Sequence, residues 1–148
     1  MADLPSAVLF ACTMNSVRSP MAEGILKFLH GTRIYVDSVG VRSLDVDGFA
    51  VTVMDEIGID ITGHRAKTFD DLEDSFFDLI IPLSPEAQHR AVEMTRVMAV
   101  DIEFWHTFDP SVIEPDNREQ RLDAYRQVRD QLMNKIKDRF PRVQAIDT

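Results

Sequence analysis

Residues 7–23, AVLFACTMNSVRSPMAE, decide the fold. The five apolar residues before Cys12 predict a buried strand that ends at this cysteine. Ser19 and Pro20 stand a few residues further on, and a serine before a proline is typical of a helix start. We therefore expect Ser19 to be the N-cap and Pro20 to be the first helical residue. A strand thus passes into a helix through the short connection of residues 12–18.

The same alternation of strand and helix continues along the chain. Strands alternating with helices indicate an α/β fold with a parallel sheet and right-handed crossovers. No linker or internal repeat divides the 148 residues, so we expect a single domain over residues 1–148. Apolar spacing predicts further strands over residues 33–38, 77–81 and 96–101. It predicts helices from Pro20 to Gly31, over 48–57, from the Ser84-Pro85 start signal to Met94, and over 118–140.

The composition is that of a globular protein, with 45% hydrophobic and 28% charged residues. Cys12 is the only cysteine, which excludes an intrachain disulfide and a zinc site built from cysteines and fits a reducing compartment. No apolar stretch is long enough for a transmembrane helix, and the first residues lack a signal-peptide pattern. We expect a cytoplasmic protein that uses no metal and no cofactor.

The formal net charge of −9 argues against nucleic acid or an anionic membrane as a partner. The acidic residues are concentrated between Asp37 and Asp78, a stretch that contains eleven carboxylates and only three cationic side chains. The ordinary interpretation of such a stretch is a solvated face. A small and strongly positive pocket is compatible with this overall charge.

Cys12 and Arg18, separated by five residues, frame the connection between the first strand and the first helix. Ligands of open parallel sheets bind at the carboxyl ends of the strands. A tight loop at this place can turn backbone N–H groups inward, and the helix N-terminus adds partial positive charge. The Arg18 guanidinium offers a planar fork for two oxyanion oxygens. These groups favour the thiolate of Cys12, so the pattern predicts a nucleophile at the base of a cradle for a tetrahedral oxyanion.

Each of these residues also has a plainer interpretation. Cys12 would be a small buried residue at a strand end, and Arg18 would be a surface charge at a helix entry. Met14 would pack or lie on the rim, and Asn15 would shape the loop because asparagine tolerates a left-handed backbone. The strand before the motif and the serine–proline pair after it favour the functional interpretation.

The sequence from Val8 to Glu23 resembles the signature of the low-molecular-weight protein tyrosine phosphatases, and arsenate reductases that share their fold have nearly the same signature. The resemblance implies a three-layer α/β/α fold with a four-stranded parallel sheet, phosphatase I-like and Rossmann-like in topology. The similar segments that extend it over nearly the whole chain are Asp37-Ser38-Val39-Gly40, Gly58-Ile59-Asp60-Ile61 with His64-Arg65-Ala66, Asp109-Pro110 and the long terminal helix.

The resemblance also implies a reaction on a phosphorylated substrate. Cys12 would attack phosphorus and form a phosphocysteine, while Arg18 stabilises the equatorial oxygens in the transition state. Asp109 would protonate the leaving oxygen and then take a proton from water. Ser19 would donate a hydrogen bond to the cysteine sulfur. The other implied site residues are the phosphate-binding Thr13, Met14, Asn15, Ser16, Val17 and Arg18, and the loop-supporting Asn15, Ser38 and His64.

Three departures from the family pattern bear on function. Met14 stands where the family usually has glycine, and no second cysteine accompanies Cys12, which excludes a protective disulfide within the loop. Ser111 and Val112 stand where the tyrosine phosphatases usually carry tyrosines that line a deep phosphotyrosine pocket. Trp105, just before the aspartate loop, would either line the pocket mouth or pack in the core.

Three functions are therefore open. The first is hydrolysis of a phosphomonoester, such as phosphotyrosine or a related aryl phosphate, in a protein or a small molecule. The second is arsenate reduction with an external low-molecular-weight thiol, because residues 82–90 lack the further cysteines that thioredoxin-linked reductases carry in the corresponding stretch. The third is a non-catalytic oxyanion-binding module, which would need Arg18 but not Asp109. The joint presence of Cys12, Arg18, Ser19 and Asp109 disfavours this third function.

Overall fold

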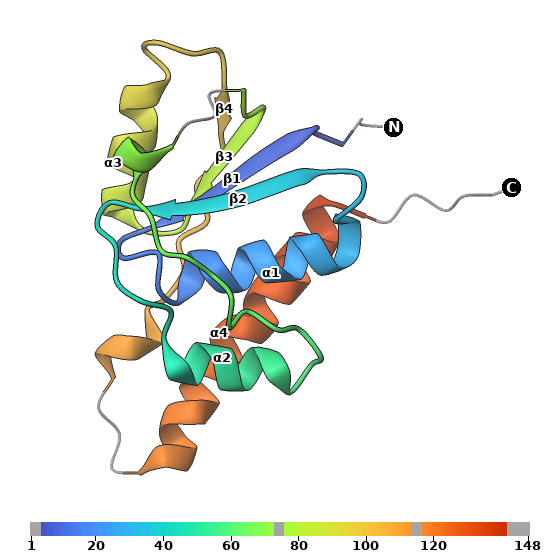
Figure 1. Ribbon diagram of the computed structural model, residues 1–148, viewed down its shortest axis with the longest axis vertical. Coiled ribbons are helices and arrows are strands. Elements are labelled where there is room, and N and C mark those ends of the chain that lie inside the picture. The colour runs from blue at the N-terminus through green and yellow to red at the C-terminus, as the bar shows by residue number, and fades with distance from the viewer. Residues whose placement is uncertain (1–3, 73–75, 114–116, 142–148) are drawn as a thin grey trace, which may run out of the picture.

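The computed structural model describes residues 4–72, 76–113 and 117–141. Strands and helices alternate along these residues (Figure 1). The strands are β1 (Ala7–Cys12), β2 (Tyr35–Gly40), β3 (Leu79–Pro82) and β4 (Asp101–Ile102). The helices are α1 (Arg18–His30), α2 (Gly48–Asp55), α3 (Pro85–Met94) and α4 (Arg118–Arg139), and two short 3-10 turns are η1 (Phe69–Asp71) and η2 (Pro110–Val112).

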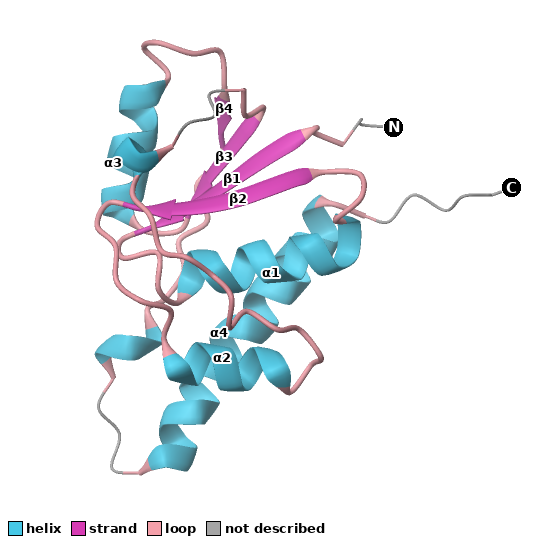
Figure 2. Ribbon diagram, in the orientation of Figure 1, coloured by secondary structure: helices cyan, strands magenta, loops and turns pink. Residues whose placement is uncertain are grey.

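The four strands form one parallel sheet in the order β2-β1-β3-β4 (Figure 2). The register places Cys12 opposite Gly40, so β1 and β2 end at the same level. On its other side β1 pairs with β3, with Ala11 opposite Pro82. Because the strands are parallel, the loops that follow them leave from one edge of the sheet, the edge to which the arrow of β2 points in Figure 2.

Helices cover both faces of the sheet. Alternate residues of β1 divide between the two apolar layers, as expected for a central strand that is buried on both sides. Val8, Phe10 and Cys12 pack in the core that contains α1, α2 and α4. Ala7, Leu9 and Ala11 pack on the other face with residues of α3 and η1. The expected three-layer α/β/α fold with a four-stranded parallel sheet is confirmed.

The start of α1 differs from the sequence-based expectation. The helix begins at Arg18, its N-cap is Val17, and no side chain makes a capping hydrogen bond. The expectations that Ser19 is the N-cap and Pro20 the first helical residue are therefore wrong: both lie inside the first turn of α1, and the Ser19 hydroxyl contacts the sulfur of Cys12. The corresponding expectation for α3 is correct: Ser84 accepts a hydrogen bond from the backbone of Ala87.

The fourth strand also differs from its expected position. The apolar pattern predicted a strand over residues 96–101, but β4 contains only Asp101 and Ile102. The backbone N–H groups of residues 96–98 donate to carbonyl groups at the end of α3, so this segment continues the helix as turns. Val97 is 85% exposed and is not a core residue. In the part of the chain described, no helix is long and apolar enough to cross a membrane.

Candidate active site

The connection between β1 and α1 forms a tight loop at the carboxyl edge of the sheet. Cys12 lies at its base and is 2% exposed. Asn15 has a φ of 54°, in the left-handed region that asparagine tolerates better than most residues. Gly40 of β2 lies against the loop, since a Cβ atom there would be 2.6 Å from the backbone nitrogen of Asn15. Asparagine and glycine thus permit the curvature of the loop and its close packing on β2.

The backbone N–H groups and the backbone carbonyl groups of this loop differ in their hydrogen bonding. The N–H groups of residues 13–17 donate to no other residue in the described ranges, which leaves them available to an anion. The uncapped N-terminus of α1 adds partial positive charge at the same place. The loop carbonyl groups are occupied by the segment after β2: the oxygens of Cys12, Thr13, Met14 and Ser16 accept from the backbone N–H groups of Val41, Arg42, Leu44 and Asp47, in that order.

The hydroxyl of Ser19 is the partner of the candidate nucleophile. Its Oγ lies 2.9 Å from the Sγ of Cys12, and both groups are buried. The same Oγ accepts a hydrogen bond of 2.9 Å from the Nδ2 of Asn15. The Ser19 hydroxyl has one proton and two acceptors within reach, the sulfur of Cys12 at 2.9 Å and the backbone oxygen of Val39 at 3.4 Å, and the sulfur is the nearer of the two. A donor aimed at the sulfur stabilises the thiolate form.

Asn15 connects the loop to a wider network. Its Nδ2 also donates to the Oγ of Ser38 at 2.9 Å, and Ser38 donates to the Oε1 of Glu23 at 2.5 Å. Its Oδ1 accepts from the backbone N–H of Lys67 at 2.9 Å. A continuous chain of hydrogen bonds thus leads from the Glu23 carboxylate through Ser38, Asn15 and Ser19 to the sulfur of Cys12.

His64 closes this network from the side. Its Nε2 lies 3.1 Å from the Oδ1 of Asn15 and 3.2 Å from the backbone oxygen of Asn15. Its Nδ1 lies 3.7 Å from the Oε1 of Glu23. Burial lowers the pKa of His64, although the negative charge of Glu23 opposes this effect. The neutral ring with its proton on Nε2 satisfies both Asn15 oxygens, because both are acceptors.

Arg18 is fixed at the loop by three polar groups. Its Nη1 donates to the backbone oxygen of Thr107 at 3.0 Å. Its Nη2 lies 3.4 Å from the Oγ1 of Thr13 and 3.7 Å from the Oδ2 of Asp109. Thr13 in turn donates to the Oγ of Ser84 at 3.1 Å. The residue Arg18 is 7% exposed. Its guanidinium is therefore pre-organised rather than freely mobile.

Asp109 lines the same cavity as the loop but comes from a different segment of the chain. It has an extended backbone before Pro110 and is the N-cap of η2. Its Oδ1 accepts from the backbone N–H of Ser111 at 3.0 Å and from the Ser111 hydroxyl at 2.7 Å. The other carboxylate oxygen faces Arg18. The carboxylate is thus held beside the group that would bind an oxyanion.

A cavity of about 90 Å³ lies between these groups. This volume is well below the roughly 300–1,000 Å³ of pockets that enclose drug-sized ligands, so it suits a small oxyanion. Leu44 and Asp47, which sequence reasoning did not single out, belong to its wall. The full lining is Cys12, Met14, Ser16, Val17, Arg18, Leu44, Asp47, Asp109 and Ser111.

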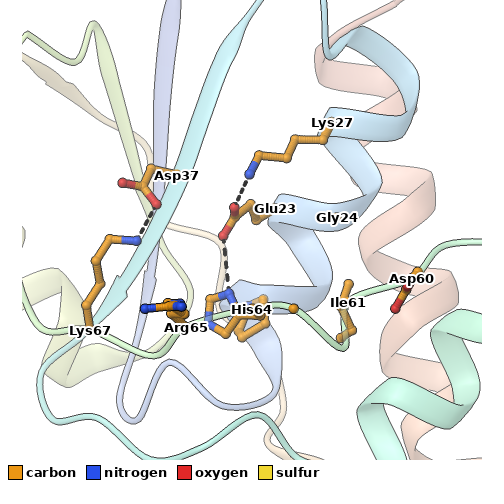
Figure 3. A pocket seen from close by; sticks show the side chains of 11 residues that line it. Glu23, Gly24, Lys27, Asp37, Asp60, Ile61, His64, Arg65 and Lys67 are labelled. Atoms are coloured by element: carbon orange, nitrogen blue, oxygen red, sulfur yellow. Dashed lines mark hydrogen bonds and ion pairs between the residues drawn. The ribbon is translucent and has the colours of Figure 1, made fainter.

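A larger pocket of about 380 Å³ lies beside the supporting network (Figure 3). Glu23 and His64 point toward each other in it, and Lys67 reaches Asp37 at 2.6 Å. Cys12 is not part of its lining, and these carboxylates already have cationic partners. His64 and Lys67 in its walls contact Asn15, so this pocket belongs to the network that supports the loop of residues 12–18. Within the described ranges, no group of three or more His, Cys, Asp or Glu side chains is placed to hold a metal ion.

The structure shows how Met14, which departs from the family pattern, and Trp105 are placed. Met14 lines the cavity and has no left-handed backbone, since Asn15 is the only non-glycine residue in the described ranges with a positive φ. Trp105 does not line the cavity. It is 8% exposed, packs on Phe10 with a ring distance of 6.1 Å and donates to Glu103, which is the core-packing alternative of the two expected.

Several supporting residues were not found by sequence reasoning. Glu23 follows Ser19 by four positions, so helical spacing places both on one face of α1, and this signal was available. Asp47 precedes Gly48 at the start of α2, where an aspartate is a typical N-cap. Thr107 acts through its backbone oxygen, which no side-chain pattern reveals.

Comparison with known proteins gives consistent relatives. The chain is 31% identical to a glutaredoxin arsenate reductase of Synechocystis sp., over 92% of this chain and 97% of that protein. It is 32% identical to an arsenate reductase of Bacillus subtilis, over 88% and 92%. Its fold is similar to the crystal structure of a low-molecular-weight protein tyrosine phosphatase from T. tengcongensis, with a TM-score of 0.71, 29% identity, and coverage of 88% of this chain and 95% of that one.

The family model for low molecular weight phosphotyrosine protein phosphatases matches residues 7–146. This match includes the loop from Cys12 to Arg18, the supporting network and the Asp109 turn. Solved structures with both kinds of name, phosphatase and arsenate reductase, share the fold. The chain belongs to the low-molecular-weight phosphotyrosine protein phosphatase family.

Proposed function

We propose that this protein hydrolyses phosphomonoesters through a phosphocysteine intermediate. The observation that carries the proposal is the convergence of Cys12, Arg18 and Asp109 on one small cavity beside a loop with free backbone N–H groups. A nucleophile, an oxyanion cradle and a proton donor are the three groups that this reaction needs.

In the first step the Cys12 thiolate attacks phosphorus, and the bond between phosphorus and the leaving oxygen breaks. Asp109 donates its proton to that oxygen, so the leaving group departs as a neutral alcohol or phenol. In the second step Asp109 takes a proton from water, which attacks the phosphocysteine. Inorganic phosphate leaves, and the thiolate that re-forms on Cys12 accepts the hydrogen bond of Ser19.

The surrounding groups stabilise the charge of the transition state. The equatorial oxygens bind to the loop N–H groups, to the N-terminus of α1 and to Arg18. Thr107 and Thr13 fix the guanidinium, so little reorganisation is needed when the substrate binds. The network from Glu23 to Ser19 fixes the donor that faces the sulfur.

An aryl phosphate, phosphotyrosine among them, is the proposed substrate class. The cavity would enclose only the phosphoryl group, and the rest of the substrate would lie at its mouth. A substrate with a good leaving group is compatible with this arrangement. Tyrosine side chains are absent from the cavity lining in the described ranges, so the aryl ring would meet Leu44 and Met14 instead.

Arsenate reduction is the second candidate, and it is favoured by the names of the relatives in Synechocystis and Bacillus subtilis. Arsenate would occupy the same cavity and form an arsenocysteine with Cys12. Because the chain has no other cysteine, two equivalents of an external thiol must supply the two electrons. The products would be arsenite, water and the disulfide of the external thiol.

One pair of assays separates these functions. Turnover of p-nitrophenyl phosphate would be measured beside arsenate-dependent consumption of glutathione, with Cys12→Ser as the matched control. The proposal expects phosphate release that the variant lacks and no arsenate-dependent thiol oxidation. Thiol oxidation without phosphate release would establish the reductase. Activity in neither assay, with vanadate still bound, would leave a binding module and contradict the proposal.

A further inference from the structure

One carboxylate in the cavity wall has no role in the reaction described above. Asp47 lies at the end of the loop that connects β2 to α2, and it lines the same cavity as Cys12 and Arg18. It is distinct from Asp109, which comes from the loop before η2. The small cavity is thus bordered by two carboxylates on different loops, although its base is built to bind an anion.

The Asp47 carboxylate is held firmly by neutral donors. Its Oδ1 accepts from the backbone N–H groups of Phe49 at 2.7 Å and Ala50 at 3.2 Å. Its Oδ2 accepts from the hydroxyl of Tyr125 at 2.9 Å. These bonds fix the position of the carboxylate but do not neutralise its charge, because none of the donors is cationic.

The nearby cations have other contacts. In the described ranges Asp47 forms no ion pair, whereas Asp109 has Arg18 at 3.7 Å. Arg42, on the same loop as Asp47, pairs with Glu86 at 3.5 Å. Arg118 and Arg121 lie over the ring of Phe49, at 6.0 and 5.4 Å from its centre. Both arginines keep their positive charge over this neutral ring, but neither forms an ion pair with Asp47, so the carboxylate lies unpaired at the wall of the cavity in the described ranges.

The Tyr125 hydroxyl is affected by the negative charges of both Asp47 and Asp109. Burial raises the pKa of the Tyr125 hydroxyl, and the hydrogen bond and charge of Asp47 and the charge of Asp109 raise it further, against an opposing effect of Arg121. Tyr125 does not line the cavity, but the two carboxylates that act on it, Asp47 and Asp109, both do. Beside them Leu44 is 58% exposed and offers an apolar surface.

We infer that Asp47 determines the charge specificity of the site: it favours phosphoesters whose leaving group is apolar next to the phosphate and positively charged beyond it. Leaving groups with a further negative charge are disfavoured by the same field. The inference rests on the proposed function, because it concerns the leaving group of that reaction. It assigns Asp47 a role in binding and none in proton transfer.

Asp47→Asn is the variant that tests this inference. Asparagine has the same shape and is an equally good N-cap, so α2 keeps its first-turn hydrogen bonds while the charge is lost. Asp47→Ser, which also retains a capping oxygen, is a second uncharged variant in case the first one folds poorly. The matched control is Asp45→Asn, since Asp45 is an exposed carboxylate of the same loop that does not line the cavity.

The probes are two non-hydrolysable benzylphosphonates that carry either a trimethylammonium or a carboxylate group in the para position. Their dissociation constants are measured from the protection of Cys12 against iodoacetamide, which does not require turnover. The wild-type chain should prefer the cationic probe, and Asp47→Asn should reduce this preference about tenfold, as expected for one unit charge near a solvent-accessible cavity. The effect should shrink as the salt concentration rises.

The outcomes separate this inference from the proposed function. Turnover of p-nitrophenyl phosphate by the wild-type chain reports the reaction alone. An unchanged ratio of the two dissociation constants in both Asp47 variants would overturn the role of Asp47. An equal change in Asp45→Asn would overturn it too, since the effect would then come from the general charge of the loop. Failure of both phosphonates to protect Cys12 would also contradict it.

Discussion

Replacement of Asn15 by alanine or glycine tests whether the geometry of the loop depends on one residue. Alanine at a φ of 54° costs about 1 kcal/mol in backbone strain, which glycine avoids. Both variants lose the acceptor for the backbone N–H of Lys67, and a buried donor without a partner costs about 1–3 kcal/mol. We therefore expect a loss of about 2–4 kcal/mol for Asn15→Ala and about 1 kcal/mol less for Asn15→Gly.

The assay is urea denaturation of both variants, with turnover measured in parallel. Asn134 is the matched control, because it is exposed within α4 and glycine there should be about 1 kcal/mol less stable than alanine. The order of the two variants thus reverses between the two sites. Equal stability of Asn15→Ala and Asn15→Gly, or greater stability of the alanine variant, would refute the left-handed backbone at this position.

Three other predictions concern the acid, the loop packing and the surface. Asp109→Asn should lower turnover by about 10² to 10⁴, with the smallest loss for the most acidic leaving groups; an equal loss across a series of aryl phosphates would show that Asp109 only shapes its turn. Gly40→Ala should displace the loop, because its Cβ would lie 2.6 Å from the Asn15 nitrogen, and phosphate should then no longer protect Cys12 from alkylation; retained protection would contradict this packing. A hydrogen bond from Arg126 is the main cause that holds the pKa of Glu56 at about 2 instead of 4.5. Because this folded-state pKa is lowered, its contribution to stability is complete above pH 4.5 and is lost as the pH falls toward 2. Glu56→Gln should flatten the pH dependence of thermal unfolding in that window by about 1 kcal/mol or less, since the pair is partly exposed, and an unchanged profile would show that the pair contributes nothing.

The sequence predicted secondary structure correctly where a hydrophobic pattern is compatible with one structure only. The apolar run before Cys12 and the spacing of the last helix predicted β1 and α4, because burial on both faces of a strand or along one stripe of a helix leaves a clear periodicity. The pattern over residues 96–101 failed because apolar residues there end a helix in turns and Val97 stays exposed. Local hydrophobicity does not report which carbonyl groups a segment will contact.

The site was predictable only in part for a similar reason. Cys12, Arg18 and Asp109 carry chemistry in their side chains and occupy recognisable motifs. Thr107 contributes a backbone oxygen, and Asp47 reaches the cavity only because the loop after β2 folds over the loop after β1. Contacts of this kind depend on tertiary structure, so no spacing rule identifies them.

The central claim is the covalent intermediate on Cys12. The most direct measurement is acid quenching of the enzyme during turnover of p-nitrophenyl phosphate, followed by intact-mass and peptide-mass spectrometry. The account predicts a transient adduct of one phosphoryl group on the peptide that contains Cys12, formed in a burst of p-nitrophenol and absent from Cys12→Ser. Steady phosphate release by the wild-type chain without this adduct, or appreciable turnover by Cys12→Ser, would contradict it.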